Sequence, residues 1–269
     1  MNRKPAVAGT FYPASPQALE KMIAGMVDAT APKTAVVGLI SPHAGYVYSG
    51  PVAGDTISHI KFEETFIILG PNHTGLGAPY SVWPGEDWET PLGNVGIDYE
   101  LRKYLLDNSS YLTEDTAAHL REHSIEVQLP FLQHFKKDFK IVPVVLGGGT
   151  PVDYNAIGRE IAHAVLATRR RAVILASSDM THYEPQESAE RKDNLAIQAI
   201  LKLDAKELFS RLTEYSISMC GYAPALVMMA AARELGANSA ELVRYQTSGE
   251  TSGDYNAVVG YAGIIIKKG

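Results

Sequence analysis

Three histidines follow short apolar segments of the sequence, at the points where those segments end. His43 follows LISP, His73 follows FIILGPN, and His182 follows AVILASSDMT. The segments are continuous and rich in β-branched residues, which is typical of strands buried on both faces. Because the carboxyl ends of parallel strands meet at one edge of a sheet, we expect the three histidines to lie close together. Neutral imidazole is the commonest protein ligand of Zn, Fe and Cu, so this edge is a candidate metal site.

The loops that carry two of these histidines have restricted backbones. Pro42 and Pro71 stiffen the chain just before His43 and His73, and glycines follow at 45 and 75, where they allow tight turns. Rigid loops hold ligands in the fixed geometry that metal coordination needs. The alternative is that each histidine is an ordinary turn or capping residue, which is a weaker explanation for three histidines at one sheet edge.

The single cysteine, Cys220, lies in MCGYAP just before a predicted apolar helix. A thiol at a helix N-terminus has a lowered pKa and can act as a thiolate ligand or a nucleophile. The alternative is an inert buried cysteine, and spacing alone does not separate the two. A cysteine-protease pairing with histidine lacks any local signature here.

The remaining histidines and the loop aromatics have more ordinary interpretations. His123 begins a predicted helix in EHSIEVQLPFL and is either a polar wall of the pocket or a plain helix start. Four others lie within or beside amphipathic stretches and are predicted to be surface or structural: His59, His119, His134 and His163. Four aromatic residues fall in predicted loops, as pocket lining or as packing over the sheet edge: Tyr46, Tyr48, Trp83 and Trp88.

The elements that must position these residues alternate between strands and helices. The apolar segments predict strands at 35–40, 65–70, 140–147, 171–177 and 256–266. Amphipathic spacing and caps predict helices at 15–28, 98–107, 123–136, 151–167, 186–201, 204–214 and 222–235, with Pro130 kinking or splitting the third. This alternation indicates an α/β fold with a mostly parallel central sheet and helices on both faces, formed as one domain over residues 1–269.

Composition restricts the class of protein. The 269 residues are 46% hydrophobic and 20% charged, as in globular proteins, and the net charge of −6 argues against nucleic-acid binding. No apolar run approaches the 18 or so residues of a membrane span. One cysteine permits no intrachain disulfide, so we expect a reducing, cytoplasmic setting. The GGG at 147–149 lacks the phosphate-loop patterns and is predicted to be a flexible turn.

Six motifs together resemble a known family. AGTFYP, SPHAGYVYSG, LGPNHTG, EHSIEVQLPFL, SSDMTHY and MCGYAP occur in this order over essentially the whole chain. The ordered set resembles the Memo family, whose prokaryotic members are called AmmeMemoRadiSam system protein B. That family is similar in fold to class III (LigB-type) extradiol dioxygenases, which open catechol rings with non-haem Fe(II).

The resemblance implies roles for individual residues. His43 and His73 match the two histidine ligands of the dioxygenase metal, and Cys220 takes the position of the carboxylate ligand. The implied ion is divalent, Fe(II) in the first place, with Cu or Zn as alternatives. His182 resembles the acid/base histidine, with Asp179 three residues earlier to orient it, and His123 resembles a second pocket histidine.

Two functions are compatible with these features. The first is a redox enzyme in which the metal and His182 act on a small substrate; the His182–Asp179 pair favours it, because a pure adapter needs no proton carrier. The second is a non-catalytic binding or adapter module that keeps the cleft for a peptide or protein partner. A zinc hydrolase with His₂Cys ligands is a third and weaker reading. The family name adds a radical-SAM protein and an AMMECR-type protein as expected partners.

Overall fold

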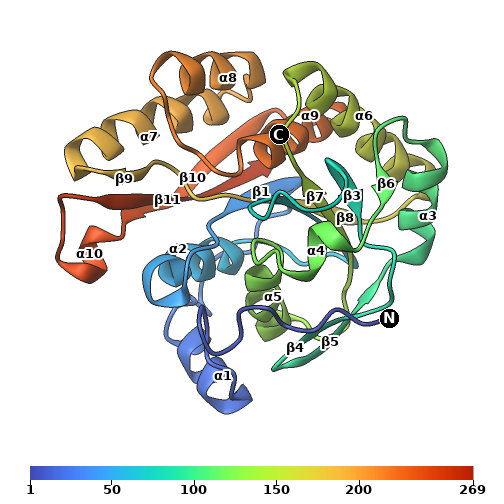
Figure 1. Cartoon of the computed structure of the whole chain (residues 1–269), viewed down its shortest axis with the longest axis horizontal. Coiled ribbons are helices and arrows are strands. Elements are labelled where there is room, and N and C mark those ends of the chain that lie inside the picture. Colours follow the sequence, from blue (N-terminus) through green and yellow to red (C-terminus); the bar gives the residue numbers. More distant parts are fainter. Residues whose placement is uncertain (269) are drawn as a thin grey trace.

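The computed structural model describes residues 1–268 and has a central sheet of 11 strands (Figure 1). Its main path runs β10-β11-β1-β8-β2-β7-β3-β6, with β4, β5 and β9 paired off this path. The strands are β1 (Gly38–Ser41), β2 (Thr65–Pro71), β3 (Tyr80–Val82), β4 (Trp88–Thr90), β5 (Gly93–Ile97), β6 (Thr113–Glu114), β7 (Lys140–Leu146), β8 (Ala172–Ser177), β9 (His182–Glu184), β10 (Ser239–Thr247) and β11 (Val258–Lys267).

The centre of this sheet is parallel. β8 lies between β1 and β2 and pairs in parallel with both, and β2 pairs in parallel with β7. Antiparallel strands flank this centre, with β11 against β1 and β3 against β7. The predicted α/β fold with a mostly parallel sheet is therefore confirmed. The ends of β1, β2 and β8 lie at one edge, as the position of the histidines requires.

Helices cover both faces of the sheet (Figure 1). The helices are α1 (Pro16–Ala24), α2 (Tyr46–Ser58), α3 (Tyr99–Asn108), α4 (Ala117–Leu120), α5 (Leu129–Phe135), α6 (Pro151–Thr168), α7 (Gln186–Leu201), α8 (Ala205–Glu214), α9 (Tyr222–Glu234) and α10 (Gly249–Ser252). Buried side chains form two clusters. Along β2, Ile67 and Leu69 join the cluster with α3, α6, α7, α8 and α9, whereas Phe66 and Ile68 join the one with α1, α2 and α5. Because strand side chains alternate, the two clusters fill opposite faces.

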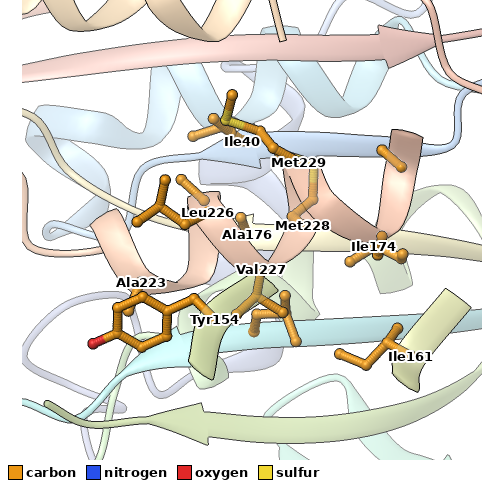
Figure 2. Packing of buried hydrophobic residues seen from close by; sticks show 14 of the residues in the cluster. Ile40, Tyr154, Ile161, Ile174, Ala176, Ala223, Leu226, Val227, Met228 and Met229 are labelled. Carbon is orange, nitrogen blue, oxygen red and sulfur yellow. The ribbon is translucent and has the colours of Figure 1, made fainter. Parts of the chain in front are cut away.

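Helix α9 begins two residues after Cys220 and is buried along most of its length. Its residues Val227 and Met228 lie in one core with Ile174 of β8 and Tyr154 of α6 (Figure 2). A side chain at Gly158 of α6 would overlap the backbone of α9, so the glycine lets the two helices approach closely. The position of α9 is therefore set by tight packing rather than by its loops.

The sequence patterns missed the short strands β3, β4, β5, β6 and β9, the short helices α4 and α10, and two longer elements, α2 and β10. Helix α2 contains Gly50, Pro51 and Gly54, which are poor helix formers and conceal its period. A side chain at Gly54 would overlap the backbone of Met26, so the glycine permits close packing against the segment after α1. Strand β10 is largely solvent-facing at the sheet edge, so it lacks a continuous apolar run.

The predictions for Pro130 and for the four loop aromatics had different outcomes. Pro130 does divide its helix: a 3₁₀ turn, Glu126–Gln128, precedes α5. The placement of the four aromatics in loops was wrong for three of them, because Tyr46 and Tyr48 belong to α2 and Trp88 to β4. Trp83 and Trp88 are fully buried below the sheet edge, packed edge to face at 6.1 Å between ring centroids. Within residues 1–268, no helix combines the length and apolarity that a bilayer crossing demands.

Candidate metal centre

His43, His73 and Cys220 meet at the predicted sheet edge. His43 follows the end of β1, His73 follows the end of β2, and Cys220 precedes α9. One nitrogen of each imidazole and the sulfur all lie within 4.8 Å of one another. Nε2 of His43 is 3.3 Å from Sγ of Cys220. The structure thus brings together the three residues that the sequence predicted as one ligand set.

The tautomer of His43 follows from its hydrogen bonds. Its Nδ1 lies 2.9 Å from Oγ of Ser177, and that hydroxyl donates its proton to the carbonyl of Ser124 at 2.6 Å. Since the Ser177 proton is used, His43 Nδ1 must be the donor, which leaves Nε2 with a free lone pair. Burial, with smaller contributions from the neighbouring histidines, lowers the pKa of His43 well below its usual value, so this imidazole is neutral.

His73 is held in the same tautomer by Glu122. Its Nδ1 lies 2.9 Å from Oε1 of Glu122, and its backbone N–H donates to Oε2 at 2.7 Å. Burial raises the pKa of Glu122, but the hydrogen bond and charge of His73 outweigh burial and lower it to about 2. Burial likewise opposes protonation of His73, yet Glu122 raises its pKa overall. The carboxylate accepts from Nδ1, so Nε2 is the coordinating atom of His73.

This donor set fits a transition-metal ion. Two imidazoles with engaged Nδ1 atoms and a thiol are ligands that Fe, Cu and Zn accept. Bonds of about 2.0–2.3 Å to nitrogen and sulfur place neighbouring ligand atoms about 3–3.6 Å apart. The 3.3 Å between His43 Nε2 and Cys220 Sγ matches that spacing. His43, His73 and Cys220 are therefore the residues that would hold the ion.

The environment of Cys220 differs from the sequence-based expectation of a lowered pKa. Burial, followed by the charge of Asp179, raises the pKa of the thiol well above its usual value. The cysteine lies ahead of the first turn of α9, whose N-cap is Gly221, so the helix dipole does not outweigh burial. A thiolate is therefore stable here only beside a cation, as in a metal site.

The glycine after Cys220 is required by packing. A side chain at Gly221 would overlap the carbonyl of Ser177 and the side chain of Ser178. Its backbone N–H donates to Oγ of Ser178 at 3.0 Å, and the N–H of Asp179 donates to Sγ of Cys220 at 3.2 Å. These contacts tie the cysteine segment to the end of β8.

His182 and Asp179 lie beside this set, but Asp179 does not orient His182 as expected. His182 Nδ1 is 3.0 Å from the carbonyl of Ser218, and its backbone N–H donates to Ser218 Oγ at 2.8 Å. The carbonyl can only accept, so Nδ1 carries a proton and Nε2 is free in the neutral ring. The carboxylate of Asp179 instead accepts the backbone N–H of His43 at 2.7 Å. Asp179 thus positions the His43 loop, and Ser218 positions His182.

His123 forms one wall of the pocket, the first of the two alternatives that its sequence position left open. Its ring stacks on His73 with 4.7 Å between centroids and an interplanar angle of 19°, and Phe11 packs on it at 4.7 Å. Burial lowers the pKa of His123. Among residues 1–268, none of the other histidines lines the pocket. His119 is a fully buried structural residue whose Nε2 lies 2.9 Å from Oγ of Ser81.

Sequence reasoning missed the residues behind the ligands. Glu122 and Ser177 fix the two imidazoles. Each is the first residue of a motif quoted above, EHSIEVQLPFL and SSDMTHY, but neither was predicted to have a role. A carboxylate directly before His123 was the available signal for Glu122. Ser177 offers none, because its role depends on β1 and β8 being neighbours.

A buried ion pair supports the same region from the N-terminal segment. Arg3 and Glu126 are both fully buried, with 2.6 Å between Nη1 and Oε2. The guanidinium also donates to the carbonyls of His119 and Glu122 and lies 4.2 Å above the ring of Trp88. The carboxylate of Glu126 accepts a hydrogen bond from the hydroxyl of Tyr12 at 2.6 Å and from two backbone N–H groups of the N-terminal segment. The first dozen residues are thereby attached beneath the metal centre.

His43 and His73 line a pocket of about 580 Å³. Its inner end contains the four site histidines and Asp179, and its outer walls include four aromatic residues. The outer lining comprises Phe11, Ala44, Gly45, Tyr48, Tyr183, Ser248, Ser252, Asp254, Ala257, Val259 and Tyr261. This volume suits a small molecule or one side chain of a peptide.

Comparison with known proteins agrees with this architecture. A sequence model described as "Memo-like protein" matches residues 3–265. A "MEMO1 family protein" of Methanococcoides burtonii is 45% identical over 98% of this chain and 100% of its own length, and one of Aquifex aeolicus is 44% identical over 98% of each. A crystal structure of the uncharacterized protein JW3007 from Escherichia coli K12 aligns with a TM-score of 0.54 over 85% of this chain and 98% of that one; at 12% identity the two share the fold alone. The motifs, the matched residues and these relatives together show that the chain belongs to the Memo family.

Proposed function

We propose that this protein is a mononuclear metal-dependent redox enzyme acting on a small substrate in the pocket. The observation that carries the proposal is the pair of imidazoles, His43 and His73, whose Nδ1 atoms are both engaged, beside the thiol of Cys220 and facing an open cavity. We propose Fe(II) as the ion, with Cu or Zn as alternatives that accept the same ligands. Such an ion, when bound, supplies Lewis-acid and one-electron chemistry.

The remaining pocket residues have roles that follow from their hydrogen bonds. His182 is the proposed general base and then acid, because Ser218 engages its Nδ1 and leaves Nε2 free toward the pocket. A proton carrier must reach the substrate without being tied to the metal, and a neutral imidazole with one free nitrogen meets this need. His123, stacked on His73, is the proposed wall that limits how a substrate approaches.

The first test concerns the ligands. Anaerobically purified wild-type protein and the variants His43→Ala, His73→Ala and Cys220→Ala are compared by metal analysis. Each variant is expected to bind metal at least tenfold more weakly, and Cys220→Ala to lose the sulfur-to-metal charge-transfer band of the Co(II)-loaded protein. His163→Ala, at an exposed histidine on α6, is the control. Wild-type metal content in all three variants would refute the ligand set.

The second test concerns turnover. Oxygen uptake is measured on a panel of small substrates, starting with catechols, for wild type and His182→Ala. The variant is expected to keep its metal and to lose about 10²–10⁴-fold in rate, the usual contribution of general acid–base catalysis. A metal-free variant would make His182 a ligand, and full turnover would remove it from the reaction.

A non-catalytic binding or adapter module is the second candidate. Cys220, in the position of a carboxylate, favours it, since a soft thiolate differs from the ligand set of ring-opening dioxygenases. The aromatic outer wall also suits a peptide side chain. Retained metal and ligand binding without any turnover across the panel would support this candidate over the enzyme.

A further inference from the structure

The charge of the pocket lining restricts what it can hold. Among the residues of 1–268 that line it, none is lysine or arginine. The acidic members are Asp179 at the inner end and Asp254 at the rim. Carboxylate and phosphate groups are normally bound by arginine or lysine, and the outer part of this pocket offers neither.

Two exposed aromatic rings form part of the outer wall. Tyr183 is 78% exposed and Tyr48 is 41% exposed, although both line the pocket. The buried Tyr261 lines the same pocket, so three phenol groups contribute to its lining. Faces of aromatic rings attract cations through their quadrupole, most strongly where several rings surround one ammonium group.

The backbone holds Tyr183 in an unusual conformation. Its φ is +57°, in the left-handed region that large L-residues rarely adopt. Tyr183 lies in a segment that is anchored by two contacts: β9 pairs with β11, and the hydroxyl of Ser218 accepts the backbone N–H of His182. Strain of this kind persists only where the surroundings enforce it, and it is concentrated at functional sites.

Asp254 is fixed at the rim with one oxygen to spare. Its Oδ1 accepts the backbone N–H of Asn256 at 2.9 Å and the side-chain amide of Asn256 at 3.0 Å. Its own backbone N–H donates to Oγ of Ser252 at 3.1 Å. Within residues 1–268, Oδ2 of Asp254 accepts no hydrogen bond, so this oxygen is available to a ligand.

We propose that the pocket selects a ligand with a cationic ammonium group, which lies at the rim between Asp254 and the rings of Tyr48 and Tyr183. The uncharged part of the ligand then extends inward along the aromatic wall toward the candidate metal ligands. The inference rests on the proposed function only for the small size of the ligand. It names amines, rather than organic acids or phosphorylated compounds, as the substrate class.

The test uses three probes that share a 2-phenylethyl group and differ in charge: 2-phenylethylamine, 2-phenylethanol and 3-phenylpropionate. Their affinities for the metal-loaded protein are measured by ligand-detected NMR titration. The amine is expected to bind about tenfold more tightly than the acid, with the alcohol between them, because an exposed carboxylate and exposed cation–π contacts each contribute a few-fold. Asp254→Asn is expected to reduce the amine-to-acid ratio about threefold, and Tyr183→Leu to reduce the amine-to-alcohol ratio.

The matched controls are Asp138→Asn, at an exposed aspartate outside the lining, and Tyr183→Phe, which keeps the ring. Acid binding as tight as amine binding, an unchanged ratio in Asp254→Asn, or no binding of any probe would overturn the inference. The titration is repeated with Cys220→Ala. An amine preference without turnover would leave the inference standing and the enzyme proposal refuted, whereas turnover with an acid preference would refute the inference alone.

Discussion

Both carboxylate oxygens of Glu122 bind His73: Oε1 lies 2.9 Å from Nδ1, and Oε2 accepts the backbone N–H at 2.7 Å. The side chain therefore fixes the loop and the ring of one candidate ligand at once. It is itself fully buried, and the backbone carbonyl of the same residue accepts from Arg3. The orientation of His73 thus depends on a chain of contacts that reaches the N-terminal segment.

Glu122→Gln is expected to weaken metal binding about 10–100-fold, the usual effect of losing a carboxylate behind a ligating histidine. The amide keeps the size of the side chain but removes the charge that raises the pKa of His73. Metal titration with a competing chelator measures the change. Glu114→Gln, at an exposed glutamate of β6, serves as the control, and equal affinities for the two variants would contradict the role of Glu122.

Gly221→Ala is expected to displace Cys220, because the added methyl overlaps the carbonyl of Ser177 and the side chain of Ser178. We expect metal affinity to fall at least tenfold and the free energy of unfolding to fall by about 1–3 kcal/mol. Gly148→Ala is the matched control, since nothing lies within 4 Å of its added methyl. Co(II) spectra and urea unfolding measure the two effects, and wild-type spectra for Gly221→Ala would show that the loop tolerates the change.

The stability of the metal-free protein is expected to depend on Asp179 in mildly acidic solution. Burial, partly opposed by the hydrogen bond from His43, raises the pKa of Asp179 from 3.8 to about 6. The folded state then binds this proton more tightly than the unfolded state, so the contribution of Asp179 to stability falls as pH rises from about 4 to 6. Asp179→Asn removes that fall. Between about pH 4 and 6, the free energy of unfolding of Asp179→Asn should rise relative to that of wild type by up to about 3 kcal/mol. Urea unfolding at several pH values measures this difference. Parallel pH profiles for the two proteins would contradict the prediction.

Arg3→Met is expected to reduce the free energy of unfolding by about 3–5 kcal/mol, because it leaves Glu126 buried without its cation. Adding Glu126→Gln removes the unpaired charge, so the double variant should lose less than the sum of the single losses. Urea unfolding of all four proteins measures the coupling. Strict additivity would show that the pair makes no joint contribution.

The sequence predicted the elements and ligands whose signals are local. Continuous apolar runs located β1, β2, β7 and β8, and the order of these parallel strands determines which loops meet. His43 and His73 followed from that placement, although three strands of a sheet can be ordered in several ways. Helix α2 was not predicted because its glycines, which lower helix propensity, are required for close contact with Met26.

Residues that act through distant partners were harder to predict. Arg3 near the start of the chain looks like an ordinary surface charge, and only the fold places it beneath Glu122. The orientation of His182 by Ser218 rather than Asp179 likewise depends on the approach of residue 218 to β9. Sequence spacing of three residues suggested the wrong partner: Asp179 lies near His182 but accepts the backbone N–H of His43 instead.

The position of β1 also affects the order of folding. Gly38 pairs with Ile174 on one side and with Ile266 on the other, so both neighbours of the strand that leads to His43 are synthesised long after it. A nascent chain therefore carries an apolar strand with an open edge until β11 emerges, and such edges recruit other chains. Contacts of this sequence separation also form slowly. We expect refolding at high protein concentration to produce aggregates or exchanged β11 strands, whereas dilute refolding restores the sheet.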